Sequence, residues 1–286
     1  MSSSSTTRRD GLPPLPTDPL PIAVVDNHVH LDIGRDGAEP LEVAEAVARA
    51  AAVGVTRLVQ VGCDLDAIDF TIDAIERFPA VLGAVALHPN EVPRLAAAGT
   101  LAAAYEKVEQ AAAHDRVRAI GETGLDYFRT GPDGVAAQQD GFRWHLDLAK
   151  RLGKAVQIHD RDAHDDVLRV LEEEGAPDRT VLHCFSGDLA MARECVERGY
   201  YLSFAGTVTF KNARTLRDAL TVTPLSQILV ETDAPYLTPS PHRGATNASY
   251  LVPHTIRAMA GVLNVDVPTL CQAVSENSER IYGPWS

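Results

Sequence analysis

Histidine and acidic residues stand at the ends of short apolar segments along this sequence. They are His28, His30, His88, Glu122, His159, His183 and Asp233. Other histidines, such as His114 and His254, fall in predicted helices or loops. Imidazole and carboxylate groups are the usual protein ligands of divalent cations. The set therefore predicts a metal site whose ligands come from distant parts of the chain.

The local sequence indicates how the side chains of His28, His30 and Glu122 could hold metal ions. His28 and His30 are two residues apart, and alternate residues of an extended segment point to the same side. Both imidazoles can therefore face one ion. Glu122 stands in AIGETGLDY with a glycine directly before it, and its two carboxylate oxygens can bridge two cations. Two ions about 3.5–4 Å apart suit a displacement in which the attacking and leaving oxygens are both stabilised.

Eight short β-rich segments alternate with Ala-rich helical segments, which is the pattern of parallel βαβ units. The predicted strands are 22–27, 56–61, 81–87, 117–121, 155–158, 180–182, 200–204 and 227–231. The predicted helices lie near 41–53, 66–77, 101–114, 135–152, 163–174, 188–198, 212–221 and 250–263. This order predicts an α/β fold, a (β/α)8 TIM-type barrel that forms a single domain over residues 21–286. An open doubly wound sheet usually has fewer strands and favours a glycine-rich turn after its first strand, where this chain has DNHVHLD.

The carboxyl ends of the strands form the active-site face of such a barrel. The histidines and acidic residues named above are therefore expected to converge on one rim. His88 is expected to lie beside the metal ligands or to contact a phosphate group. Four cationic residues follow strand ends and are candidates for binding phosphate. They are Arg129, Arg161, Lys211 and Arg243.

Composition limits the classes of function. The formal net charge of -13 argues against a protein that coats nucleic acid through a broad basic surface. A nuclease remains compatible with this charge, because bound metal ions supply positive charge locally. Residues 1–20 are rich in Ser, Thr and Pro and predict a flexible arm, neither a signal peptide nor a membrane span. The four cysteines form no C-x-x-C pair, which predicts reduced thiols and a cytoplasmic location.

Taken together, these segments resemble the TatD family of metal-dependent deoxyribonucleases, which belongs to the amidohydrolase-like barrels. The resemblance covers about 260 residues, from Asp26 to the C-terminus. The matching segments are DNHVHLD at 26–32, LHPNEV at 87–92, IGETGLDYFR at 120–129, IHDRDA at 158–163, HCFSG at 183–187, ETDAPYLTP at 231–239 and NSERIY at 277–282. Each segment is short, but the whole series in one order is highly specific.

The resemblance implies two divalent ions, Mg2+ or Mn2+ in use and Zn2+ as an ion that can be bound on purification. It implies that one ion is held by His28, His30, Glu122 and Asp233. It implies that the second is held by Glu122, His159 and His183, with Glu122 bridging the two. Two segments depart from the family pattern. RGATNAS at 243–249 has lost basic residues, which affects the expected contact with phosphate, and Asn90 stands where a histidine is common.

The predicted activity is hydrolysis of DNA phosphodiester bonds by metal-activated water, with Asp233 as a ligand that also accepts a proton. The acidic surface favours single-stranded or frayed DNA and exonuclease-like trimming, and nothing in the sequence indicates an obligate protein partner. The alternative within the hydrolases is an ester or amide hydrolase, such as an aminoacyl-tRNA deacylase, because the sequence does not fix the electrophile. A non-enzymatic scaffold stabilised by metal is the alternative from another class, although structural zinc sites are usually rich in cysteine.

Overall fold

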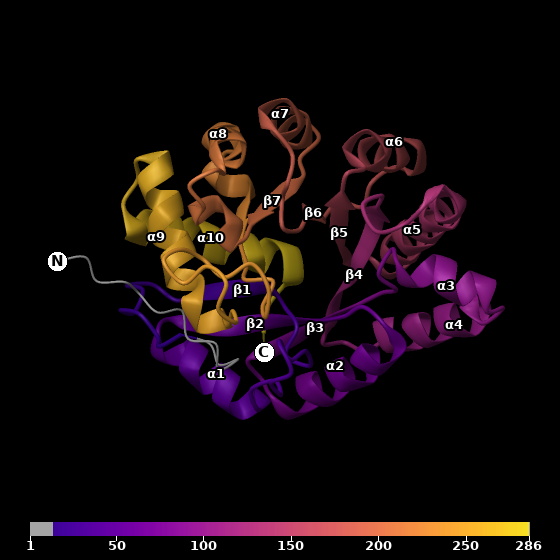
Figure 1. The fold of residues 1–286 in the computed structure, drawn as a ribbon, viewed down its shortest axis with the longest axis horizontal. Coiled ribbons are helices and arrows are strands. Elements are labelled where there is room, and N and C mark those ends of the chain that lie inside the picture. The colour runs from indigo at the N-terminus through magenta and orange to yellow at the C-terminus, as the bar shows by residue number, and fades with distance from the viewer. Residues whose placement is uncertain (1–13, 286) are drawn as a thin grey trace.

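Eight parallel strands, each followed by helical structure, make up the fold in a computed structural model that describes residues 14–285 (Figure 1). Their order around the sheet is their order in the chain, so the predicted TIM-type barrel is confirmed. The strands are β1 (Val24–Val29), β2 (Val55–Gly62), β3 (Val81–Val85), β4 (Val117–Asp126), β5 (Ala155–Arg161), β6 (Thr180–Leu182), β7 (Tyr201–Phe204) and β8 (Ile228–Val230). Each lies within a few residues of its predicted position, and β4 is extended by five residues beyond the predicted end at Gly121.

The helices cover the outside of these strands (Figure 1). They are α1 (Val43–Ala52), α2 (Leu65–Arg77), α3 (Glu91–Ala97), α4 (Leu101–Ala112), α5 (Pro132–Leu152), α6 (His164–Glu174), α7 (Leu189–Glu197), α8 (Arg214–Val222), α9 (Val252–Leu263) and α10 (Val267–Tyr282), with 3-10 turns η1 (Gly206–Thr209), η2 (Leu225–Gln227) and η3 (Ser249–Leu251). The sequence analysis missed α3 and α10. Helix α3 is short and contains Pro93. The buried face of α10 includes the polar residues Asn277 and Ser278, which interrupt the apolar residues that recur at helical spacing.

The segments of β1 and β8 are joined by one isolated β-bridge and by hydrogen bonds to side chains. Val29 pairs with Ala234 beyond the end of β8, and the backbone N–H of His30 donates to the carbonyl of Ala234 at 2.9 Å. Deeper in the barrel, the carboxylate of Asp26 accepts from the backbone N–H and the hydroxyl of Thr232, at 2.8 and 2.6 Å. The seam is therefore fixed directly beside the first histidines of the predicted metal site.

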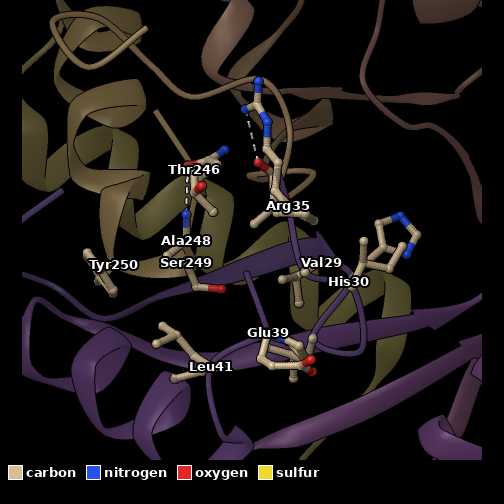
Figure 2. A pocket seen from close by; sticks show the side chains of 17 residues that line it. Val29, His30, Arg35, Glu39, Leu41, Thr246, Ala248, Ser249 and Tyr250 are labelled. Carbon is tan, nitrogen blue, oxygen red and sulfur yellow. Dashed lines mark hydrogen bonds between the residues drawn. The ribbon is translucent and has the colours of Figure 1, made fainter. Parts of the chain in front are cut away.

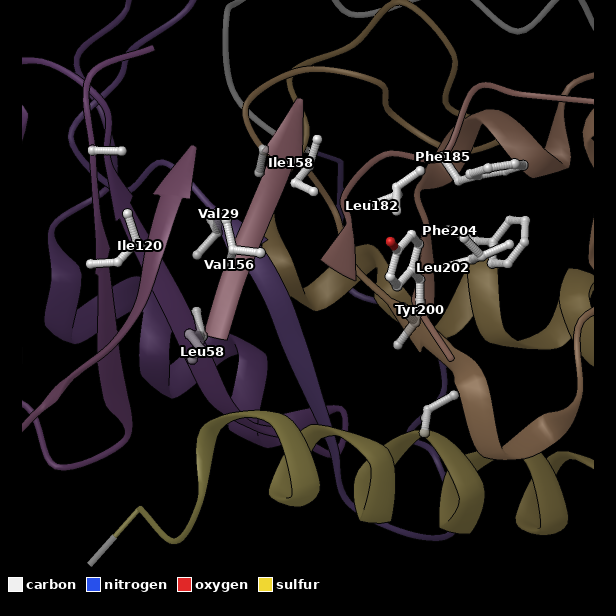
Figure 3. Close-up of a cluster of buried hydrophobic side chains, with 14 of the residues drawn as sticks. Val29, Leu58, Ile120, Val156, Ile158, Leu182, Phe185, Tyr200, Leu202 and Phe204 are labelled. Carbon is white, nitrogen blue, oxygen red and sulfur yellow. The ribbon is translucent and has the colours of Figure 1, made fainter. Parts of the chain in front are cut away.

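Two apolar clusters fill the inside and the outside of the barrel. Strand side chains such as Val156 face the helices, and Figure 3 shows this packing around Leu182 and Phe204. Val25, Val59 and other strand residues form a separate interior cluster with Tyr282 at the end of α10. The C-terminal end of α10 therefore closes the barrel at the amino ends of the strands, while the opposite end stays available for a site.

Part of the predicted N-terminal arm packs against the barrel. Leu20 is buried, and its backbone N–H donates to the carbonyl of Val53 at 2.9 Å. The predicted flexibility of residues 1–13 lies outside the described residues. Among the residues that are described, none of the helices combines the length and the apolar character that a membrane span requires.

Candidate metal centre

Four ligand atoms from three regions of the chain converge at the seam of the barrel. They are Nε2 of His28, Nε2 of His30, Oε2 of Glu122 and Oδ1 of Asp233. The two imidazole nitrogens are 3.3 Å apart, and each lies 3.6–3.9 Å from both carboxylate oxygens. Ligands about 2.1 Å from a tetrahedral ion are about 3.4 Å from one another. The spacing therefore fits one small divalent cation.

A second group of ligand atoms lies on the other side of Glu122. Its Oε1 is 2.5 Å from Nδ1 of His159 on β5 and 2.9 Å from Nε2 of His183, which follows β6. The two oxygens of one carboxylate thus face different pairs of imidazoles. The structure brings together all six residues that the sequence analysis predicted as ligands, and it places Glu122 between the two groups.

Hydrogen bonds behind the imidazoles set which nitrogen faces the centre. Nδ1 of His30 is 3.1 Å from the carbonyl of Val61, so this nitrogen donates and Nε2 keeps its lone pair. Nδ1 of His183 is 3.2 Å from Oε1 of Glu231, which also accepts from the backbone N–H of Cys184 at 2.7 Å. Histidines that bind metal almost always donate their other N–H in this way. This arrangement supports a metal-binding role for both rings.

The electrostatics of the ligand set favour the binding of positive charge. Although burial favours the neutral acid, the imidazoles of His183, His88 and His159 hold the pKa of Glu122 well below its usual range. Burial alone would lower the pKa of His30, but Asp233 and Glu122 raise it to about 9. A divalent cation would replace the protons that these imidazoles otherwise take up. The residues present therefore fit a metal ion.

Two buried carboxylates near the centre were missed by the sequence analysis. Glu231 faces His183, and Oδ2 of Asp126 lies 3.4 Å from Nε2 of His159. Both stand inside the motifs that had been singled out, as the first residue of ETDAPYLTP and the Asp of GETGLDY. An acidic residue within a buried apolar strand was the available signal, because a carboxylate is rarely buried without a partner.

His88, a predicted substrate-binding residue, borders the same centre. Its Nε2 lies 3.6 Å from Oε1 of Glu122, and its ring makes an edge contact with the ring of His159. Nδ1 of His88 accepts from the backbone N–H of Asn90 at 3.1 Å. Asn90 in turn donates to Oδ2 of Asp126 at 3.0 Å. The residue that departs from the family pattern is thus hydrogen-bonded to both His88 and Asp126.

Backbone conformation beside the ligands restricts which residues fit. Gly124 has φ +134, and a Cβ built there would lie 2.1 Å from the carbonyl oxygen of His159. Asp233 has φ +54, a left-handed conformation that non-glycine residues adopt rarely and that recurs at functional sites. Its backbone N–H donates to the carbonyl of His28 at 3.0 Å. This contact ties the loop after β8 to the end of β1.

The four predicted phosphate-binding cations differ in their surroundings. Arg161, the last residue of β5, lies over the ring of Phe128 with 4.0 Å from guanidinium carbon to ring centroid. Arg243 lies in the same way over Phe210, at 4.4 Å. Arg129 follows β4 and is exposed, and Lys211 is exposed just beyond η1. Within residues 14–285, no measured contact joins the side chain of Lys211 to the metal ligands, so its role stays a prediction.

A small cavity of about 50 Å³ lies next to His30, between the loop after β1 and the segment before α9 (Figure 2). Val29, Leu41 and Tyr250 form part of its apolar wall, and Arg35, which also lines the cavity, donates to the carbonyl of Ala245 at 3.0 Å. A cavity of about 150 Å³ is large enough to hold benzene. The cavity beside His30 has about a third of that volume and is too small for a nucleobase, so a nucleotide would have to use the open rim.

An eight-stranded α/β barrel with imidazoles and carboxylates on its C-terminal rim belongs to the class of barrel proteins that carry a metal centre. A family model described as TatD related DNase matches residues 25–283, and the chain belongs to this family. The uncharacterized metal-dependent hydrolase TatD of Mycobacterium tuberculosis is 48% identical over 265 residues, which cover 91% of this chain and 98% of the relative. The uncharacterized metal-dependent hydrolase YcfH of Escherichia coli K12 is 38% identical, with 91% and 95% covered.

Solved structures agree with this assignment. The crystal structure of YJJV, a TatD homolog from Escherichia coli K12, superimposes with a TM-score of 0.81 at 27% identity, and covers 91% of this chain and 98% of that chain. A TatD family hydrolase from Entamoeba histolytica gives a TM-score of 0.80 at 18% identity, which shows the shared fold. The protein is therefore a metal-dependent hydrolase of the TatD family.

Proposed function

We propose that this protein hydrolyses phosphodiester bonds of DNA with two divalent ions, Mg2+ or Mn2+. The observation that carries the proposal is the position of Glu122, whose Oε2 faces His28 and His30 while its Oε1 faces His159 and His183. A carboxylate between two groups of ligands is the arrangement of a two-metal site. Such sites suit an in-line displacement at phosphorus. The description of the matching family, TatD related DNase, supports the same activity.

His28, His30, Glu122 and Asp233 would hold one ion, and Glu122, His159 and His183 the other. Bound ions supply an activated water nucleophile and neutralise charge on the phosphate. Asp233 can accept the proton of that water, because its side chain keeps 16% of its surface exposed. Burial favours the neutral form of Asp233, but a hydrogen bond from His30 and the charges of His28 and His183 lower its pKa, so the carboxylate is ionised at neutral pH.

The acidic composition of the chain and the arginines at the rim of the barrel favour a short or single-stranded substrate. The net charge of -13 disfavours binding of a long duplex through a broad basic surface. Arg161 and Arg243 are placed on aromatic rings at the mouth of the barrel, where they can hold individual phosphate groups. We therefore propose trimming of single-stranded or frayed ends, with no protein partner required and with the cytoplasm as the location.

The test follows 3′-labelled and 5′-labelled single-stranded oligonucleotides on a gel, with metal-stripped protein and with added Mg2+ or Mn2+. Glu122→Gln keeps the size of the side chain and removes its charge, and it should abolish shortening. Glu279→Gln is the matched control, because Glu279 pairs with Arg57 on the outer surface at 2.7 Å. Metal content and circular dichroism verify that both variants fold.

Shortening that needs metal and Glu122 would establish the nuclease and give its polarity. An intact oligonucleotide in the presence of folded, metal-loaded protein would contradict the proposal. The same preparations should then be assayed on carboxylic esters and on aminoacyl-tRNA. Hydrolysis there would assign the centre to an ester or amide hydrolase.

A further inference from the structure

Two exposed aromatic side chains stand at the mouth of the barrel. Phe128, in the link between β4 and α5, is 63% exposed, and Tyr236, after β8, is 43% exposed. Among residues 14–285, Leu15 is the other large apolar side chain with comparable exposure. Aromatic side chains exposed along a nucleic-acid path are the platforms on which single-strand binders stack bases.

A guanidinium group lies over the ring of Phe128. Arg161 lies over Phe128 at 4.0 Å, and no carboxylate of the described chain lies within ion-pair distance of it. Arg143 and Arg169, by contrast, each contact two carboxylates.

The Phe128–Arg161 pair lies close to the proposed metal ligands. Arg161 is two residues beyond His159 in β5, about 7 Å along the strand. The hydroxyl of Ser186, in the loop that follows His183, donates to the carbonyl of Asp160 at 3.0 Å. This loop therefore lies beside the end of β5 that carries Arg161. A group bound here would be a close neighbour of the bond that is cleaved.

We propose that Phe128 and Arg161 form a nucleotide subsite, in which one base of a single-stranded nucleic acid stacks on Phe128 while Arg161 binds the phosphate attached to it. The proposal rests on the proposed nuclease function and names the residues that select its substrate. A flat ring joined to an anion matches an aromatic face beside an unpaired guanidinium. A base inside a duplex is already paired and stacked, so this subsite favours single strands and frayed ends.

The test is a cycle that removes the ring of Phe128 and the base of the DNA separately and together. KM is measured for oligonucleotides that carry an abasic nucleotide at successive positions beside the cleaved bond. With the native protein, removal of the stacked base should raise KM about 10-fold, the size expected for one base on an aromatic ring. With Phe128→Ala, KM should be raised already, and removal of that base should add little. Phe128→Trp should restore the dependence on the base.

Matched controls separate this role from a general effect on the surface. Leu15→Ala removes an exposed apolar side chain elsewhere, and Arg77→Ala removes a guanidinium that lies 5.2 Å from the Phe78 ring at the far end of α2. Both should keep the native response to the missing base. Arg161→Ala should raise KM and weaken the dependence of binding on salt.

Binding of a short fluorescein-labelled oligothymidylate, measured by anisotropy with Ca2+ in place of Mg2+, makes the two proposals distinguishable. Cleavage without coupling between Phe128 and any base would overturn the subsite and leave the nuclease intact. Binding that needs Phe128 without any cleavage would support the subsite and contradict the nuclease. Neither binding nor cleavage by folded, metal-loaded protein would overturn both.

Discussion

Oδ2 of Asp126 lies 3.4 Å from Nε2 of His159, on the opposite side of the imidazole ring from Glu122. The carboxylate of Asp126 is itself held by the side chain of Asn90 at 3.0 Å and by the backbone N–H of Arg129 at 2.9 Å. A carboxylate behind a metal-binding imidazole orients the ring and increases its basicity. Asp126 is therefore placed to orient His159 within the second group of ligand atoms.

In the proposed two-ion centre, Asp126→Asn should weaken binding of the second ion while leaving the first unchanged. The substitution keeps the size of the side chain and removes the charge that faces Nε2 of His159, and losses of about 10–100-fold in affinity are typical of such changes. Calorimetric titration of the metal-free protein with Mn2+ measures both affinities. Asp160→Asn is a matched control, because Asp160 pairs with His164 at 2.7 Å instead. An equal loss at both sites would show that Asp126 has a general structural role.

The fold was largely predictable because its signals are local. Buried parallel strands are short apolar runs, and alternation with helices determines their arrangement. The end of β4 was not predictable in this way. The ladder between β4 and β5 shifts register between Ile120 and Thr123, and it then continues as far as Asp126 and Arg161. This pairing depends on contact between two different strands, and the residues of one strand alone do not indicate how far the ladder extends.

The convergence of the six candidate metal ligands was predictable from residue type and position, because a barrel collects the carboxyl ends of its strands on one face. The residues behind them were not. Asp126 lies beside His159, and Glu231 lies beside His183, in each case from another part of the chain. Positions in the sequence do not indicate that these side chains are close in space. The pairing of Arg161 with Phe128 likewise depends on how two loops meet.

Metal binding should release protons near neutral pH. Despite burial, which lowers it, the pKa of His159 is raised to about 8 by Asp126 and Glu122, and that of His30 is raised to about 9 by Asp233 and Glu122. Both values lie above the ordinary 6.5, so these imidazoles hold protons at about pH 7 in the metal-free protein, and apparent metal affinity should rise as pH increases through about 8–9. Calorimetry in buffers of different ionisation enthalpy counts the protons. A proton release that does not decline above about pH 9 would contradict this assignment.

Gly124→Ala should destabilise the protein and disturb the second group of ligands. The added Cβ would meet the carbonyl oxygen of His159 at 2.1 Å, and φ +134 is strained for alanine. Strain and overpacking together predict a loss of about 2 kcal/mol or more in the free energy of unfolding, measured by urea denaturation. Gly131→Ala is the control, because a Cβ there meets nothing within 4 Å and its φ is -70. A variant at Gly124 as stable as this control would show that β4 adjusts without cost.

His145 should make the stability of the protein depend on pH, away from the metal centre. It is buried in α5, where Nε2 accepts from the backbone N–H of Leu87 at 3.1 Å and Nδ1 donates to the carbonyl of Gly141 at 2.7 Å. Burial lowers its pKa from 6.5 to about 4, although the hydrogen bond to Gly141 opposes this change. The unfolded chain therefore binds a proton more readily than the folded protein between these two values.

The contribution of His145 to stability is present above about pH 6.5 and is lost as pH falls towards 4. Between about pH 7 and pH 5 the loss should amount to about 2 kcal/mol in the free energy of unfolding. His145→Gln retains polar atoms without a titrating ring, and its stability should fall by that much less over the same interval. The difference between the two denaturation series isolates this histidine, because both proteins keep the acidic and imidazole groups of the metal centre. Parallel pH profiles for the two proteins would show that the folded protein accommodates a protonated His145.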